Sequence, residues 1–523
     1  MKQNKVERNI SAIEMEIKMD IKRAKEEIVN TVKAYHMTDE TGHFLIPTVR
    51  QRPVLLIGPP GIGKTAIMEQ VARECEIGLV SYTMTHHTRQ SALGLPFIEK
   101  KQYSGKTFSV TEYTMSEIIA AVYEKIEKTG CHNGILFIDE INCVSETLAP
   151  VMLQFLQCKT FGNAKVPDGW VIVAAGNPPE YNRSVREFDV VTLDRVKLIN
   201  VEADYSVWKK YAYQQNIHGA ILSYLETKQE NFYHIETTVD GKSFVTARGW
   251  EDLSELIYVY EKLNLKIDSS VVVQYLQDTK IAVDFANYLE LYYKYEGTYK
   301  IDDILNGKAD EKLINRIQNA AFDEKISVVG LILSRLNTEF MKVNKYDLLV
   351  TEIFETLKTF HSKVQLGSED VPFTILKQLI DDKRKIYELS KENVMFEKDQ
   401  EISTYKALEA LNAFALKLAG SGEINGEKAF EIVRKEFVEM KEIRENMIHT
   451  ASCLLENAFD FMETAFGQSS EMVLFVTELS AGFYSLRFIQ DNGCERFYKY
   501  NIDLSNTSSR NTLINEIDMI DKI

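Results

Sequence analysis

The chain has 523 residues, of which 45% are hydrophobic, and a formal net charge of −16. At about 150 residues per domain, this length suggests roughly three domains. The negative charge argues against sequence-independent binding to nucleic acid, which depends on cationic contacts with phosphates. The sequence holds no run of about 18 apolar residues, so we expect no transmembrane helix.

The N-terminus and the cysteines bear on the compartment. The first ten residues, MKQNKVERNI, lack the apolar core of a signal peptide. The six cysteines are scattered without any C-x-x-C spacing, which is typical of reduced thiols and not of a zinc site or a disulfide framework. We therefore expect a cytoplasmic protein.

Residues 6–35 carry apolar side chains at every third or fourth position, with charged residues between them. This spacing predicts one long amphipathic helix. The helix would either pack on its own domain or serve as a coiled-coil or partner-binding arm. Residues 36–50 are expected to connect it to the first core strand.

Residues 51–67 contain the most specific motif of the chain. The apolar run 54–57 predicts a buried strand, a helical pattern begins near residue 66, and GPPGIGKT between them matches G-x-x-x-x-G-K-[ST]. The loop N–H groups and the helix N-terminus are suited to phosphate oxygens. Lys64 would reach the β- and γ-phosphates, and Thr65 would ligate the accompanying Mg²⁺. The predicted nucleotide-binding residues are Gly58, Pro59, Pro60, Gly61, Ile62, Gly63, Lys64, Thr65 and Ala66.

Two later apolar runs end in residues that suit the same chemistry. The run 134–138 leads into Asp139-Glu140, and the run 170–175 leads into Gly176-Asn177. Open α/β sheets bind ligands at the carboxyl ends of their strands. Asp139 would hold Mg²⁺ directly or through water, and Glu140 would orient and deprotonate the water that attacks the γ-phosphate. Asn177 would contact that water or the γ-phosphate, or act only as a turn residue before proline.

These motifs, in this order, resemble those of the AAA+ ATPases. The stretch Leu193-Asp194-Arg195-Val196 is similar to the L-D-R-F box of MoxR-like AAA+ proteins, with valine in place of the usual aromatic residue. Residues 243–250, SFVTARGW, resemble the S-x-R stretch that begins the sensor 2 helix of that group. The resemblance covers about residues 35–260.

The resemblance implies roles for three residues outside the first two motifs. Asn177 corresponds to sensor 1, Arg195 to an arginine finger supplied to the neighbouring subunit, and Arg248 to sensor 2, which acts from the lid within one chain. Arg186 is the next candidate for the finger, followed by Arg183. A finger supplied in trans requires a ring, and the resemblance implies a hexamer.

Two stretches rich in polar and turn residues, 94–111 and 159–170, interrupt the core pattern. The first is expected to be either a surface hairpin or an ordinary loop. The resemblance implies that both are insertions or pore-proximal loops, with Phe161 as the candidate pore residue.

The second half has no catalytic signature. Residues 201–262 are expected to continue as helices, as in an AAA+ lid, and periodic apolar spacing predicts long helices beyond them, including one at about 427–466. Aromatic runs at 292–295 and 497–500 are either core and interface residues or a nucleic-acid stacking surface. The predicted organisation is an N-terminal helix (1–35), an αβα nucleotide-binding domain (36–200), a helical lid (201–290) and an α-helical partner- or client-binding region (291–523).

The expected fold class is α/β plus all-α: a P-loop AAA+ core with a helical lid and a largely helical C-terminal region. We expect an ATPase that requires ATP and Mg²⁺, forms a ring and remodels or activates a partner protein. The resemblance implies a partner with a von Willebrand factor A domain. A nucleic-acid-stimulated motor and an ATP-switched assembly scaffold with little turnover are the alternatives.

Overall fold

The computed structural model describes residues 18–501 apart from 87–91, 93, 162–163, 182–187, 239–240, 366–370 and 393–394. The chain divides into two compact units. Unit 1 comprises residues 1–207 and 388–396, and unit 2 comprises residues 208–387 and 397–523.

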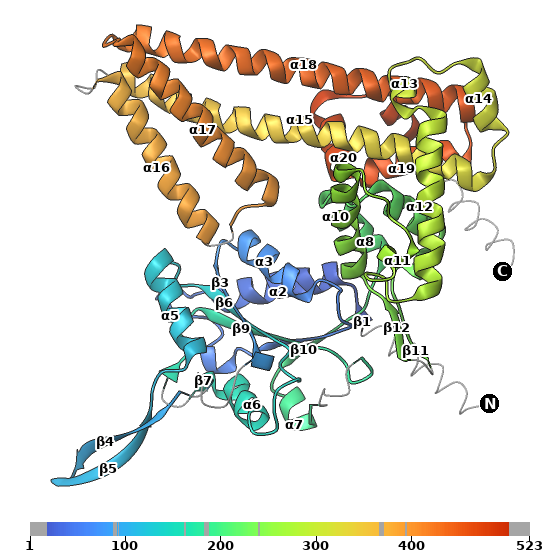
Figure 1. Ribbon diagram of the computed structural model, residues 1–523. Coiled ribbons are helices and arrows are strands. Elements are labelled where there is room, and N and C mark those ends of the chain that lie inside the picture. Colours follow the sequence, from blue (N-terminus) through green and yellow to red (C-terminus); the bar gives the residue numbers. More distant parts are fainter. Residues whose placement is uncertain are drawn as a thin grey trace, which may run out of the picture. The chain divides into compact units, whose positions relative to one another are not determined.

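Unit 1 is built on a six-stranded parallel sheet (Figure 1). Its strand order is β1 (Lys18–Met19), β10 (Lys197–Val201), β2 (Val54–Ile57), β9 (Trp170–Gly176), β6 (Gly134–Asp139) and β3 (Gly78–Thr83). The central strands are continuous apolar runs because helices cover both faces of a parallel sheet. Since β2, β9 and β6 are neighbours and run in parallel, their carboxyl ends lie side by side at one edge.

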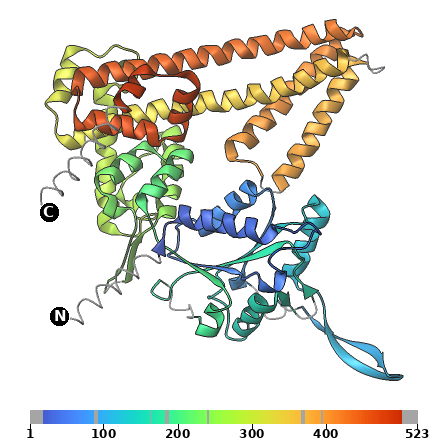
Figure 2. The same cartoon turned by 180° about the vertical axis from the view of Figure 1, so that it is seen from behind.

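Helices cover both faces of this sheet, as the predicted αβα class requires. Helices α5 (Glu117–Thr129) and α6 (Ala149–Cys158) share a buried core with sheet residues such as Leu136 and Ile172. Helices α2 (Ile21–His36) and α3 (Lys64–Glu74) contact each other and lie on the opposite side of the sheet (Figure 2). The short helix α7 (Val190–Leu193) precedes the strand β10.

The N-terminal helix is shorter than the apolar spacing predicts. It begins at Ile21, and Lys18–Met19 instead form the edge strand β1, paired with β10. The side chain of Asp20 caps the helix by accepting a hydrogen bond from the Arg23 N–H at 2.8 Å. The helix packs on its own unit through buried residues such as Ile28 and Val32, and its remaining predicted part lies outside the described residues.

Among the described residues, three antiparallel strand pairs lie outside the six-stranded sheet. In unit 1, β4 (Pro96–Tyr103) pairs with β5 (Lys106–Tyr113), and β7 (Thr160–Phe161) pairs with β8 (Ala164–Lys165). The first pair confirms the surface hairpin expected at 94–111, although its second strand continues to Tyr113. In unit 2, β11 (His234–Thr238) pairs with β12 (Gly241–Val245), where we had expected only helices. The sequence signal for this hairpin is Asp240-Gly241, a common turn pair, between alternating residues.

The remainder of unit 2 is helical (Figure 1). Its first helices are α8 (Tyr205–Gln214, beginning in unit 1), α9 (Gly219–Thr227), α10 (Ala247–Leu263), α11 (Ser269–Val272), α12 (Thr279–Tyr299), α13 (Ile301–Leu305) and α14 (Glu311–Gln318). The later helices are α15 (Phe322–Gln365), α16 (Pro372–Glu392, ending in unit 1), α17 (Lys398–Ser421), α18 (Gly426–Phe466), α19 (Ser470–Ala481) and α20 (Phe483–Asn492). The long helix predicted at 427–466 is confirmed as α18.

Helices α15 and α18 pack along each other and form a long arm (Figure 1). At the far end of the arm, α16 and α17 join them around one apolar core, which includes Ile353, Leu376, Leu411 and Val433. Within the described residues no single helix is long and apolar enough to cross a membrane, and only the pair α19–α20, bent by 85°, passes that test jointly.

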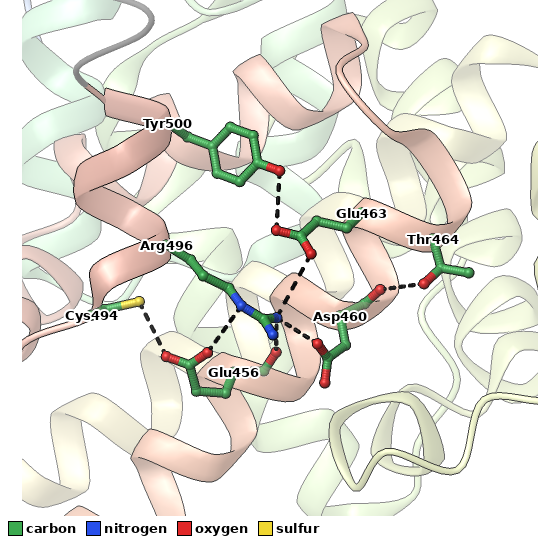
Figure 3. Close-up of polar contacts among 7 residues, drawn as sticks. All are labelled: Glu456, Asp460, Glu463, Thr464, Cys494, Arg496 and Tyr500. Carbon is green, nitrogen blue, oxygen red and sulfur yellow. Dashed lines mark hydrogen bonds and ion pairs between the residues drawn. The ribbon is translucent and has the colours of Figure 1, made fainter.

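Polar contacts of several side chains fix the last described residues to α18 (Figure 3). The guanidinium of Arg496 forms ion pairs with Glu456 and Asp460, which lie one helical turn apart on α18. Tyr500 donates a hydrogen bond to Glu463 at 3.0 Å. In the two aromatic runs, Phe497 and Tyr292 are only 1% and 4% exposed and belong to the core, whereas Tyr498 is 43% exposed.

Candidate nucleotide-binding site

The loop between β2 and α3 has the backbone that phosphate binding requires. Gly61 and Gly63 adopt φ angles of +73° and +90°, which side chains beyond glycine rarely tolerate. A Cβ on Gly58 would lie 2.7 Å from the Val201 carbonyl oxygen, so this position also has no room for a side chain. The α3 N-terminus follows without any acidic residue in its first turn, which keeps the helix end attractive to anions.

Lys64 is the first residue of α3 and is only 8% exposed. Its ammonium donates to the carbonyl oxygens of Gly58 and Pro59 at 2.7 Å, and to Oδ1 of Asn177 at 2.8 Å. A buried charge of this kind is stabilised by hydrogen bonds from all sides. The positive charge is therefore held inside the glycine loop and directly against the residue at the end of β9.

Thr65 and Asp139 meet across the gap between α3 and β6. The Thr65 hydroxyl donates to Oδ2 of Asp139 at 2.8 Å, although the two residues are 74 positions apart in the sequence. A hydroxyl and a carboxylate are the hard oxygen ligands that Mg²⁺ prefers. The structure thus brings together the two residues predicted to hold the metal.

Glu140 follows Asp139 in a left-handed conformation, with φ of +54°. Such a backbone is uncommon for a residue with a side chain and recurs at functional sites. Its N–H donates to Oδ1 of Asp139 at 2.8 Å, so Asp139 is bound on both carboxylate oxygens. The half-buried Glu140 is thereby placed beside the predicted metal ligand at the carboxyl edge of the sheet.

Arg195 lies between α7 and β10 on the surface of unit 1. Its guanidinium donates a long hydrogen bond, 3.5 Å, to the Val191 carbonyl, and its charge helps to lower the pKa of Asp189, but it forms no ion pair with another described residue. An arginine without a structural ion pair is available to another molecule. The competing candidates Arg183 and Arg186 lie outside the described residues.

Arg248 belongs to unit 2, near the start of α10, and is exposed. Thr246 caps this helix by accepting a hydrogen bond from the Gly249 N–H at 3.3 Å. One turn further along, burial raises the pKa of Glu251 to about 7, and the positive charge of Arg248 partly opposes this shift. The helix therefore presents Arg248 next to a carboxyl group that titrates near neutral pH.

Phe161 is not a pore residue in this structure. It is 1% exposed and stacks on Phe155 of α6, with ring centroids 3.9 Å apart. The turn-rich sequence around it conceals a short hairpin whose apolar side chain completes the core. By contrast, the β4–β5 hairpin exposes several apolar side chains, among them Phe97, Ile98 and Phe108.

Sequence reasoning did not identify Asn142. This residue is 5% exposed, and its Nδ2 donates to the backbone oxygen of Asn177 at 2.8 Å. The only signal in the sequence is its place two residues after Glu140, because its partner lies 35 positions away and is a backbone atom.

Lys159, next to Phe161, should make the stability of unit 1 depend on pH. Burial lowers its pKa to about 8, while its ammonium donates to the Thr48 carbonyl at 2.8 Å. In the unfolded chain the pKa would be about 10.4. Between these values the unfolded chain binds more protons, so the contribution of Lys159 to stability rises with pH, by at most about 3 kcal/mol.

We expect wild type to gain stability over Lys159→Met as the pH rises from 8 to 9.5, with no such trend below 8. Thermal unfolding of both proteins at several pH values measures this difference and cancels the contribution of other groups. Lys128→Met, an exposed lysine of α5, is the control. An unchanged difference across this range would contradict the burial of the Lys159 charge.

The comparisons with known proteins agree with this geometry in one respect. Residues 54–192 match the family model described as "ATPase family associated with various cellular activities (AAA)", a range that contains Lys64, Asp139, Glu140 and Asn177 but not Arg195 or Arg248. None of the curated proteins matches the chain.

Among solved structures, the chain is similar to a crystal structure from Cytophaga hutchinsonii whose protein is provisionally described as an ATPase. The two are 19% identical, the match covers 35% of this chain and 52% of the other, and the TM-score is 0.21. The chain thus spans about half the length of that protein, and a similarity this weak carries no argument about fold or activity.

Proposed function

We propose that this chain, whose residues 54–192 match the AAA family model, hydrolyses ATP at a site shared between neighbouring copies and uses the resulting movement to remodel or activate another protein. The observation that carries the proposal is the contact of Lys64 with Asn177 together with that of Thr65 with Asp139. Both contacts lie at the edge where three parallel strands end.

The residues at this edge fit ATP and Mg²⁺. The loop glycines have the positive φ angles that a phosphate-binding loop needs, and Lys64 supplies a buried positive charge. Thr65 and Asp139 would hold the metal, whose chemistry when bound is to neutralise charge on the phosphates.

Four residues would take part in hydrolysis. Glu140 would accept a proton from the attacking water, and the Asn177 side chain would orient that water or the γ-phosphate. Arg195 of the neighbouring copy and Arg248 of the same chain would place permanent charge where negative charge accumulates during transfer. The exposed position of Arg195 and its lack of an ion pair to any described residue support a role between copies.

The finer part of the proposal is a MoxR-like hexamer that acts with a partner carrying a von Willebrand factor A domain. It rests on the residues 193–195 and 243–250 that resemble this group. We assign the binding of that partner to the helical arm formed by α15 and α18.

Steady-state ATP hydrolysis by the wild type and by Lys64→Met tests the proposal. We expect Lys64→Met to lower turnover by about 100-fold or more, because it removes a preorganised charge from the phosphates. Lys22→Met, an exposed substitution on α2, is the matched control. Equal turnover in wild type and Lys64→Met would place any activity elsewhere. Absence of turnover with and without candidate partners would favour the scaffold.

A further inference from the structure

Asn142 lies in the turn that follows Glu140 and links this turn to the carboxyl end of β9. The Ile141 N–H donates to the Ala175 carbonyl at 3.0 Å, and the Asn142 side chain donates to the Asn177 carbonyl at 2.8 Å. The turn after Glu140 is therefore attached, by two successive residues, to the end of β9 and to the residue that follows it. Neither bond is part of the sheet ladder.

Gly176 makes room for this attachment. A Cβ on Gly176 would lie 2.5 Å from Oδ1 of Asn142, far inside contact distance. The absence of a side chain at residue 176 thus allows Asn142 to reach the carbonyl of the next residue. The conformations of Gly176 and Asn142 depend on each other.

These hydrogen bonds connect the start of α3, the end of β6 and the end of β9 in one network. Lys64 donates to the Asn177 side chain, and Thr65, its neighbour in α3, donates to Asp139. Glu140 and Asn142 follow Asp139 in the chain, and the Asn142 side chain donates to the Asn177 carbonyl oxygen. Loss of the Asn142 bond would remove a link between Glu140, the proposed base, and Asn177, the proposed sensor 1.

Packing alone does not explain an asparagine here. Oδ1 of Asn142 is buried and has no hydrogen-bond partner among the described residues. Burying such a group costs about 1–3 kcal/mol, whereas an apolar side chain of similar size would avoid this cost. The chain nevertheless has asparagine at residue 142, where its Nδ2 donates to the Asn177 carbonyl oxygen.

We propose that Asn142 is a positioning residue that fixes Asn177 relative to Glu140 during ATP hydrolysis. This inference rests on the ATPase function proposed above. Asn142 does not touch the nucleotide; it acts through the backbone of Asn177. Its loss should therefore slow the chemical step and spare nucleotide binding, which depends on Lys64 and the glycine loop.

The test compares kcat and KM for ATP in wild type, Asn142→Leu and Asn142→Ala, with nucleotide affinity measured separately by a fluorescent ATP analogue. We expect kcat to fall about 10- to 100-fold, the effect of a small misplacement of a reacting group, while KM and affinity stay close to wild type. Ile172→Val is the control for general destabilisation, because it removes one methylene from the buried core of β9, the strand that precedes Asn177.

A second substitution makes the test sharper. Gly176→Ala should displace Asn142 and lower kcat in the wild-type background, but should have little further effect in Asn142→Ala, because the two changes break the same contact. Unchanged kcat in the Asn142 variants, additive effects in the double variant, or parallel losses of kcat and nucleotide binding would each overturn the inference. Absence of turnover in the wild type would overturn the proposed function as well.

Discussion

Glu140→Gln should leave ATP bound and almost unhydrolysed. Glutamine keeps the size and the hydrogen-bonding capacity of the side chain but cannot accept a proton, so only the base function is lost. General-base catalysis contributes about 10²–10⁴-fold to rate, and we expect turnover to fall within that range. ATP affinity should not fall, since Lys64, Thr65 and Asp139 retain their contacts. Hydrolysis is measured at saturating ATP, and binding by equilibrium titration.

The result shows whether Glu140 acts as the base or is needed for ATP binding. Glu146→Gln, an exposed residue six positions further on, is the matched control and should hydrolyse ATP as wild type does. If Glu140→Gln retained turnover, another group would have to be the base, and the left-handed backbone of Glu140 would need a different explanation. If it also lost ATP binding, the substitution would have disturbed the Asp139 carboxylate that binds the Glu140 N–H.

The sequence predicts which residues meet at this edge of the sheet because the motifs that carry them are local. A glycine loop, a Lys-Thr pair and an acidic strand end are each read within a few residues, and the parallel order of β2, β9 and β6 then brings them together. Three predicted strands end at one edge, so placing Asp139 and Asn177 beside Lys64 requires no knowledge of loops.

The features that sequence reasoning missed depend on distant partners. Asn142 acts on a backbone oxygen 35 residues away, and no side-chain pattern marks such a bond. Met19 is read as part of a helix because apolar spacing cannot distinguish it from an edge strand until the Asp20 cap is considered. Phe161 sits in a turn-rich stretch that suggests exposure, yet its stacking on Phe155 buries it.

Arg195 raises a different difficulty, because its proposed target is in another molecule. Within one chain the structure shows an exposed arginine without an ion pair to any described residue, which is what a group reserved for a neighbour requires. Arg195→Ala should lower ATP turnover by about 10³-fold or more, the effect typical of an arginine finger, with ATP binding to the single chain retained. Arg195→Lys should restore little, since a point charge does not replace the guanidinium fork.

Mixing Arg195→Ala with Glu140→Gln then tests whether the site is shared. In a mixed ring, an Arg195→Ala chain supplies an intact Glu140 and a Glu140→Gln chain supplies an intact Arg195, so about one interface in four is complete if the chains mix at random. Turnover should therefore reappear in the mixture although each protein alone is inactive. Arg50→Ala, an exposed arginine elsewhere on unit 1, is the control and should hydrolyse ATP alone. Normal hydrolysis by Arg195→Ala would transfer the finger role to Arg186, and two inactive variants that fail to complement would place both residues in the same chain's site.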